Sequence, residues 1–151
     1  MSESTVPRAA LWLGLSGLMP TLGMLVAMLA WPEAREIAAR GGIAYGAVIA
    51  SFVGGAWWGL AAARAVPEDL PRRLVISVIP SLVAWPAVLA PPVAGLVLLA
   101  LLFAVLLPTD RRFLAEGLAP AWWLGLRRPL SLGMAALHAA AALVLALGAT
   151  V

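Results

Sequence analysis

The single histidine of the chain is the residue most able to support chemistry. His138 lies within the long uncharged stretch SLGMAALHAAAALVLAL, and an ionisable side chain inside such a stretch marks a candidate functional site. Ala135, Ala141 and Ala142 lie three or four positions away and leave space beside the imidazole. This space suits axial ligation of a tetrapyrrole, haem or chlorophyll-type, or contact with a quinone or a lipid. The alternative is a neutral imidazole hydrogen-bonded within the protein, for example to Tyr45 or to a serine.

Few other residues could support catalysis. The chain contains no cysteine, which excludes disulfides, thiolate nucleophiles, iron–sulfur ligation and cysteine-based zinc sites. One histidine alone does not make a catalytic triad or a zinc site. The 7 acidic residues fall between the apolar stretches, and we interpret them as solvated. The sequence therefore predicts a protein that is not an enzyme.

The composition indicates a membrane protein. The chain is 64% hydrophobic and only 11% charged, whereas soluble domains are about half apolar and a quarter charged. All 10 basic residues are arginine, which with the many alanines suggests a GC-rich bacterial genome. These arginines lie in short segments between apolar stretches, a pattern that serves membrane topology and lipid headgroups. Nucleic-acid binding is not expected.

Five uncharged apolar stretches must position His138. About 20 helical residues cross the hydrocarbon core of a bilayer. The sequence predicts an all-α integral membrane protein, a compact bundle of five transmembrane helices in a single domain. The third and fourth stretches are short, are joined by two prolines, and predict a hairpin of two short spans or one that does not fully cross. The predicted spans are residues 9–31, 41–63, 74–90, 93–107 and 130–151.

Arginine placement predicts the orientation of this bundle. Two arginines, Arg35 and Arg40, fall on one side of the membrane. The positive-inside rule then predicts a cytoplasmic N-terminus and a periplasmic C-terminus in a bacterial inner membrane. The other side holds Arg8, Arg64, Arg72, Arg73, Arg111, Arg112, Arg127 and Arg128.

The second stretch carries two rows of small residues, which let membrane helices approach closely. Its Gly42/Gly46 and Gly55/Gly59 pairs have GxxxG spacing. We interpret the rows as packing surfaces inside the bundle. The alternatives are homodimerisation, docking onto a larger membrane complex, and a glycine-lined groove for a cofactor or a lipid. The first row is Gly42, Gly46, Ala50 and Gly54, and the second includes Ser51, Gly55 and Gly59.

The segment before the last stretch combines aromatic residues, leucines and arginines. This pattern predicts an amphipathic element lying in the membrane interface. Asp110 is expected to pair with one of the arginines at a wet surface. An anionic phospholipid headgroup is one predicted partner, and arginines that serve topology alone are the alternative. The predicted interface residues are Arg111, Arg112, Trp122, Trp123, Arg127 and Arg128.

Three motifs resemble one known family. The stretches YGAVIASFVGGAWWGLA, IPSLVAW and DRR…EGLAPAWWLGLRRPLSL are similar to those of the domain-of-unknown-function 3429 family. These are small multi-pass proteins of bacterial inner membranes, with relatives in the mitochondrial inner membrane. The resemblance implies a location and a fold, and the family has no established activity.

The function most consistent with these patterns is structural. The five predicted spans contain no Asp, Glu, Lys or Arg, whereas ion-coupled transport requires ionisable groups at membrane depth. We therefore expect a non-enzymatic accessory, assembly or stabilising subunit of a larger inner-membrane complex, for example an energy-converting one. The alternatives are a cofactor-binding protein centred on His138 and a carrier of small solutes or lipids.

Overall fold

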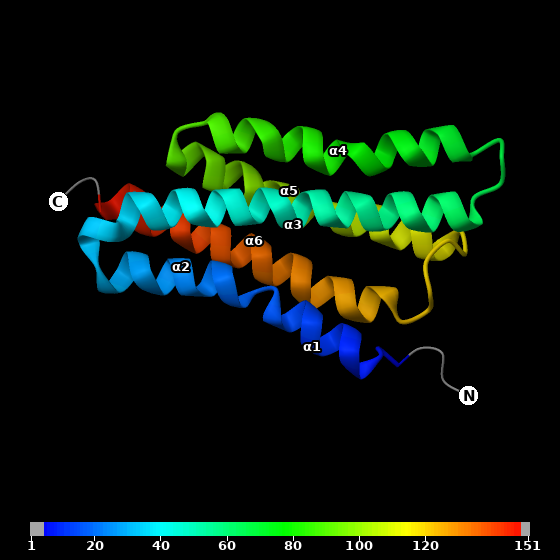
Figure 1. Ribbon diagram of the computed structural model, residues 1–151, viewed down its shortest axis with the longest axis horizontal. Helices are drawn as coiled ribbons and strands as arrows, with labels where there is room; N and C mark the ends of the chain where they lie inside the picture. The colour runs from blue at the N-terminus through cyan, green and yellow to red at the C-terminus, as the bar shows by residue number, and fades with distance from the viewer. Residues whose placement is uncertain (1–4, 149–151) are drawn as a thin grey trace.

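The computed structural model of the protein describes residues 5–148, and most of them are helical (Figure 1). In this part of the chain, five helical stretches are long and apolar enough to cross a membrane, the first being formed by α1 and α2 together. The predicted all-α membrane bundle is confirmed. The elements are α1 (Arg8–Ser16), α2 (Met19–Ala30), the short 3₁₀ helix η1 (Pro32–Ala34), α3 (Arg35–Arg64), α4 (Leu70–Leu89), α5 (Pro92–Ala115) and α6 (Trp123–Gly148).

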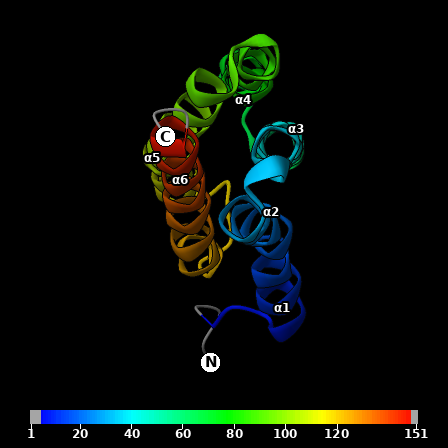
Figure 2. The ribbon, with the colours of Figure 1, turned by 90° about the vertical axis from the view of Figure 1, so that its left-hand side faces the viewer.

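Helix α3 lies between α2 and α4 on one side of the bundle (Figure 2). It contacts α2, α4, α5 and α6, while α5 packs along α6 (Figure 1). Helix α1 contributes no buried residue, contacts α6, and lies apart from α4 (Figure 2). We call the end where α1 and α6 begin the arginine-rich end, because it holds eight of the ten arginines. The other two, Arg35 and Arg40, lie at the opposite end.

Several helices extend beyond the uncharged stretches that predicted them. Helix α4 has 20 residues and α5 has 24, so neither is short. Helix α4 begins before Arg73, and α5 continues through Asp110. Arg73 and Asp110 were placed outside the predicted spans, but each has a charged partner within the fold, and the helices include them.

The predicted amphipathic element before the last span is not a separate helix. Residues 116–122 form a loop, and α6 begins directly at Trp123. Gly117 has a positive φ of 72°, the left-handed conformation that glycine adopts most readily, and it follows the end of α5. Leu118 and Ala119 are buried, so the loop is held against the bundle.

The first span is divided at Gly17 and Leu18. Pro20 has no amide N–H to donate to the carbonyl of Ser16, and α1 ends at Ser16. The break frees the carbonyl of Gly17, which accepts a hydrogen bond of 2.9 Å from the Tyr45 hydroxyl. Tyr45 therefore joins α3 to the break and does not contact His138 through its hydroxyl.

The two rows of small residues on α3 lie in different surroundings. The first row, from Gly42 to Gly54, is buried. A Cβ added at Gly54 would collide with the carbonyl oxygen of Ser77 in α4. The second row is exposed, and a Cβ at Gly55 or Gly59 would meet no atom within 4 Å.

Candidate functional site

Asp110 forms the centre of a buried polar cluster near the arginine-rich end. It lies in the last two turns of α5, and its side chain is 0% exposed. The sequence interpretation placed this residue in a solvated loop, and the structure corrects that placement. Burying a carboxylate is costly unless charged and hydrogen-bonding partners compensate it.

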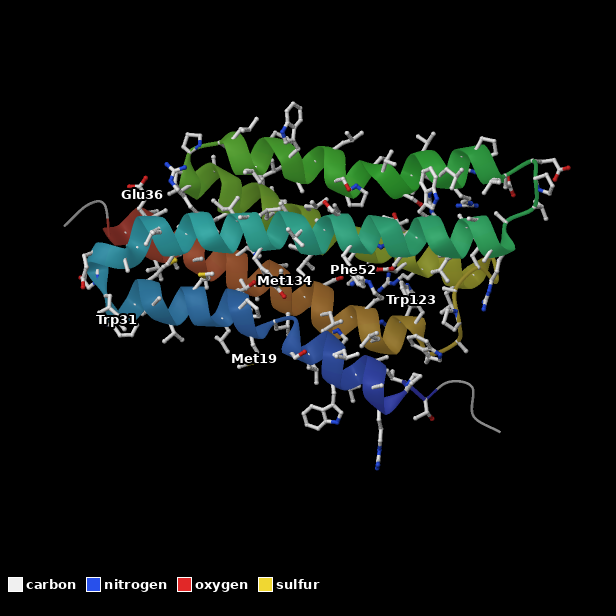
Figure 3. All side chains as sticks on the ribbon, in the orientation of Figure 1. Met19, Trp31, Glu36, Phe52, Trp123 and Met134 are labelled. Carbon is white, nitrogen blue, oxygen red and sulfur yellow. The ribbon has the colours of Figure 1, made fainter. Side chains whose placement is uncertain are left out.

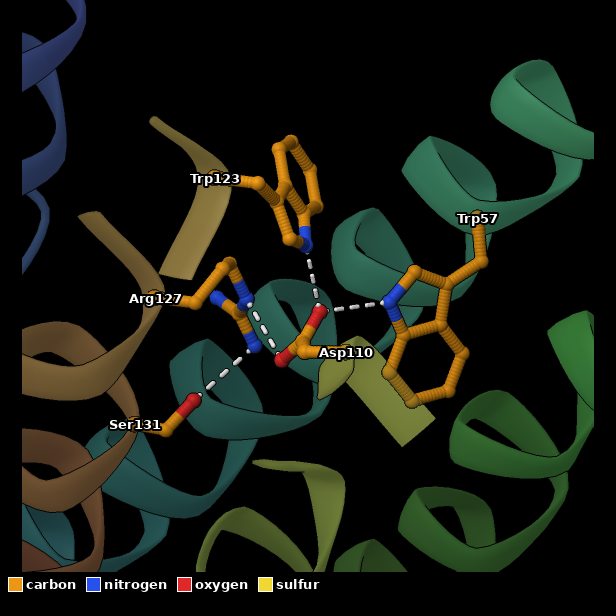
Figure 4. A network of polar contacts seen from close by, with 5 residues as sticks. All are labelled: Trp57, Asp110, Trp123, Arg127 and Ser131. Atoms are coloured by element: carbon orange, nitrogen blue, oxygen red, sulfur yellow. Dashed lines mark hydrogen bonds and ion pairs between the residues drawn. The ribbon is translucent and has the colours of Figure 1, made fainter. Parts of the chain in front are cut away.

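Three nitrogen donors surround the Asp110 carboxylate (Figure 4). The indole Nε1 atoms of Trp57 and Trp123 both donate to Oδ1, at 2.8 and 2.7 Å. Nε of Arg127 donates to Oδ2 at 3.1 Å, and Nη2 of Arg127 donates to the Ser131 hydroxyl at 2.9 Å. We call these five residues the buried polar cluster. Each carboxylate oxygen has at least one donor, and the two formal charges balance.

Three helices supply the cluster. Trp57 comes from α3, Asp110 from α5, and the other three residues from α6. On α6 they recur at every fourth position, Trp123, Arg127 and Ser131, which places them along one helical face. This spacing is a sequence signal that could have indicated the site. The cluster therefore joins α3, α5 and α6 at one end of the bundle.

A second ion pair lies at the same end. Arg73 of α4, which is buried, pairs through Nη2 with Glu116 just after α5. The Arg73 guanidinium also lies 5.9 Å from the ring centre of Phe113, a cation–π distance. Phe113 in turn stacks on Trp57 with centroids 5.8 Å apart. The two ion pairs are thus connected through a pair of buried aromatic rings.

His138 lies in a closely packed environment toward the opposite end. Its side chain is 0% exposed, with Nδ1 2.8 Å from the carbonyl oxygen of Met134 and Nε2 3.3 Å from that of Gly42. Phe103 lies beside the ring, with centroids 5.5 Å apart. Gly46 approaches so closely that even a Cβ there would collide with Nε2. This packing does not fit a tetrapyrrole beside His138, and the imidazole contacts main-chain carbonyls, not Tyr45 or a serine.

The structure divides the predicted interface residues into two groups. Arg111, Arg112 and Arg128 are exposed, and Trp122 is half-buried, as a headgroup contact requires. The other two, Trp123 and Arg127, instead bind Asp110. Trp57 and Ser131 were not expected to take part in a polar site, because each lies within an apolar stretch of the sequence.

The chemistry available to this cluster is limited. Asp110 and Arg127 satisfy one another, and no buried side-chain nitrogen or oxygen in residues 5–148 lacks a hydrogen-bond partner. The same residues contain no group of three His, Cys, Asp or Glu side chains placed to hold a metal ion. The arrangement fits a structural role, in which complementary charges fix the relative positions of three helices.

Comparison with known proteins agrees with the architecture. Residues 6–143 match the family described as "Protein of unknown function (DUF3429)". Transmembrane protein 69 of Xenopus tropicalis is 40% identical over 92 residues, which are 55% of this chain and 33% of that protein. The chain thus spans about a third of the length of this relative. No solved structure matches the chain. The protein is therefore a multi-pass membrane protein that belongs to the DUF3429 family.

Proposed function

We propose that the protein is a non-enzymatic accessory or stabilising subunit that packs against a larger complex of the inner membrane. One observation carries the proposal. The second small-residue row of α3, which includes Ser51, Gly55 and Gly59, faces outward with open space beside both glycines. The first row of the same helix is already occupied by neighbours within the chain.

The way in which helices associate in a membrane indicates that this outward row is a docking surface. Lipid tails are as apolar as leucine, so helices associate through close backbone approach and not through exclusion from water. A smooth strip beside the bulky Phe52 and Trp58, both exposed, is a surface into which another helix can fit. A second copy of this chain is the other candidate for this strip, and identification of the retained partner distinguishes it from a different membrane protein.

The non-enzymatic part of the proposal is supported by the use of polar side chains. Asp110, Arg127 and Arg73 each form an ion pair inside the bundle. Both imidazole nitrogens of His138 contact main-chain carbonyls. These side chains are therefore engaged in holding helices together, whereas a catalytic or proton-carrying group needs access to a substrate or a water path.

Replacing the two outward glycines by leucine tests the docking surface. We expect the unmodified protein, purified in a mild detergent, to retain a stoichiometric membrane partner. The double variant Gly55→Leu/Gly59→Leu should retain about one tenth or less of that amount of partner, because the added side chains prevent close approach of the two helices. Ala104→Leu is the matched control, since Ala104 is exposed on α5. Quantitative mass spectrometry of the purified material measures the ratio.

Three outcomes would count against this role. The first is a monodisperse protein without a stoichiometric partner. The second is a partner that the glycine double variant retains as well as the control does. The third is a partner that proves to be a second copy of this chain, which would indicate a homo-oligomer instead.

We also propose a bacterial inner-membrane location with the arginine-rich end in the cytoplasm. Two of the arginines there, Arg73 and Arg127, are buried in ion pairs, so six remain for the topological signal. The opposite end has only Arg35 and Arg40. The bias toward the arginine-rich end therefore persists, and by the positive-inside rule it supports a cytoplasmic N-terminus.

Single cysteines introduced into this cysteine-free chain test the orientation. Glu33→Cys lies at the opposite end, and Asp69→Cys lies in the turn between α3 and α4 at the arginine-rich end. A membrane-impermeant maleimide applied to intact spheroplasts should label the first variant, and should label the second only after lysis. The reverse pattern would contradict the proposed orientation.

A further inference from the structure

A lateral groove runs along one side of the bundle between α1, α3 and α6. It consists of two adjoining cavities of about 300 and 110 Å³, a size at the lower end of ligand sites. Figure 3 shows Phe52 of α3 and Trp123 and Met134 of α6 in this region. The residues that line both cavities are Leu13, Gly14, Phe52, Val53, Arg127 and Leu130.

The groove has the length and the lining of a site for a lipid chain. It extends along α6 from Trp123 to Met134, about 16 Å at the helical rise per residue. Its walls are almost entirely apolar. Helix α1, which forms one wall, buries no residue of its own, so the groove lies at the margin of the bundle where membrane lipid can enter it.

One polar group lines this apolar groove. The structure gives hydrogen bonds from Nε and Nη2 of Arg127 and none from Nη1, although a guanidinium carries N–H groups on all three nitrogens. No fully buried polar side-chain atom of the described chain is unpaired, so Nη1 reaches accessible space. The accessible space that Arg127 lines is the groove. Asp110 already balances its charge, so the spare N–H suits a neutral carbonyl oxygen.

A polar hollow lies at the arginine-rich end of the bundle, where the groove also begins. It has a volume of about 340 Å³ and is lined by Thr5, Arg64, Pro120, Ala121 and Trp122. Trp122 lines the hollow, Trp123 lines the groove, and the rings of these two consecutive residues contact one another. Arg64 lies about 12 Å along α3 from Ala56, a groove residue. An exposed guanidinium at the interface, beside a hydroxyl and an indole, is suited to a phosphate group.

We propose that the groove and the polar hollow together bind one anionic phospholipid. The phosphate pairs with Arg64 in the hollow, an ester carbonyl accepts a hydrogen bond from Nη1 of Arg127, and one acyl chain lies in the groove. The backbone of Arg127 lies about 6 Å along α6 from the first residue of the helix, Trp123. This depth fits the glycerol esters, which lie just below the headgroups. The two arginines thus have separate parts, one for charge and one for a neutral acceptor.

Groove-filling substitutions test the acyl site. The protein is reconstituted in vesicles of phosphatidylglycerol and phosphatidylethanolamine, extracted with mild detergent, and examined by native mass spectrometry. We expect one phosphatidylglycerol per chain, and an at least fivefold loss of this adduct in Ala56→Trp. Ala10→Trp fills the same groove from α1, so a folding defect in one variant leaves the test intact. Ala104→Trp, on the exposed face of α5, is the control and should retain the lipid.

A charge substitution tests the headgroup site separately. Arg64→Gln should reduce the preference for phosphatidylglycerol over phosphatidylethanolamine by at least threefold. Arg72→Gln removes another exposed arginine from the same end, and it should leave the preference unchanged. The proposal is overturned if the unmodified protein retains no phospholipid or retains a quinone in its place. Equal lipid retention by Ala56→Trp and Ala104→Trp, or equal preference in the two arginine variants, would also overturn it.

Discussion

Asp110→Asn should destabilise the folded protein by about 3–5 kcal/mol, the typical effect of removing one partner from a buried ion pair. The substitution keeps the shape of the side chain but removes its charge. The guanidinium of the buried residue Arg127 is then left without an anion, and one of the four hydrogen bonds in the cluster loses a good acceptor. Equilibrium unfolding in bicelles, followed by tryptophan fluorescence, measures the change.

Arg111→Gln is the matched control for this prediction. Arg111 is the next residue on α5 and is exposed, so its replacement should change the unfolding free energy by no more than about 0.5 kcal/mol. Equal stability of the Asp110→Asn and Arg111→Gln proteins would contradict a structural role for the cluster. It would show that water or lipid headgroups satisfy Asp110 as well as the cluster does.

Gly54→Ala should be the most damaging single-methyl change on α3. The new Cβ would collide with the carbonyl oxygen of Ser77, a main-chain atom in the middle of α4 that cannot rotate away. Helices α3 and α4 must then move apart, at a cost of about 1–3 kcal/mol or more. The midpoint of thermal unfolding in detergent should fall, and the folded yield should fall with it.

The neighbouring glycine provides the control. A Cβ at Gly55 would meet no atom within 4 Å, and alanine favours a helix over glycine, so Gly55→Ala should be neutral or slightly stabilising. Equal unfolding temperatures for the two alanine variants would contradict the close packing of Gly54 in α3 against the Ser77 carbonyl in α4. A loss in Gly55→Ala alone would indicate that the outward row, not the inward one, determines stability.

Hydropathy predicts most of this fold. Five apolar stretches indicated five spanning helices in the correct order, because each helix must be long and apolar enough to cross the bilayer. The beginning of α4 and the end of α5 were not predicted. Arg73 and Asp110 lie outside the predicted spans, yet both lie inside helices because a partner compensates each charge.

The candidate site was only partly predictable, since its members are far apart in the sequence. Pairing of Asp110 with an arginine was expected, and Arg127 is that arginine. The burial of Asp110 could not be read from the sequence, because it depends on Trp57 of α3 donating to the carboxylate and on Ser131 of α6 accepting from Arg127. The repeat of Trp123, Arg127 and Ser131 at every fourth position was the available sequence signal. This repeat identifies the site only once it is known that α5, which carries Asp110, lies beside α6.

A double-mutant cycle on Asp110 and Arg127 tests the central claim, that this buried ion pair holds the arginine-rich end of the bundle together. The cycle compares the unfolding free energies of the unmodified protein, Asp110→Asn, Arg127→Gln and the double variant. Because each single change leaves one charge buried without a partner, we predict a coupling energy of about 2–3 kcal/mol, with the double variant more stable than the two losses added together. Simple additivity of the two single changes would contradict it.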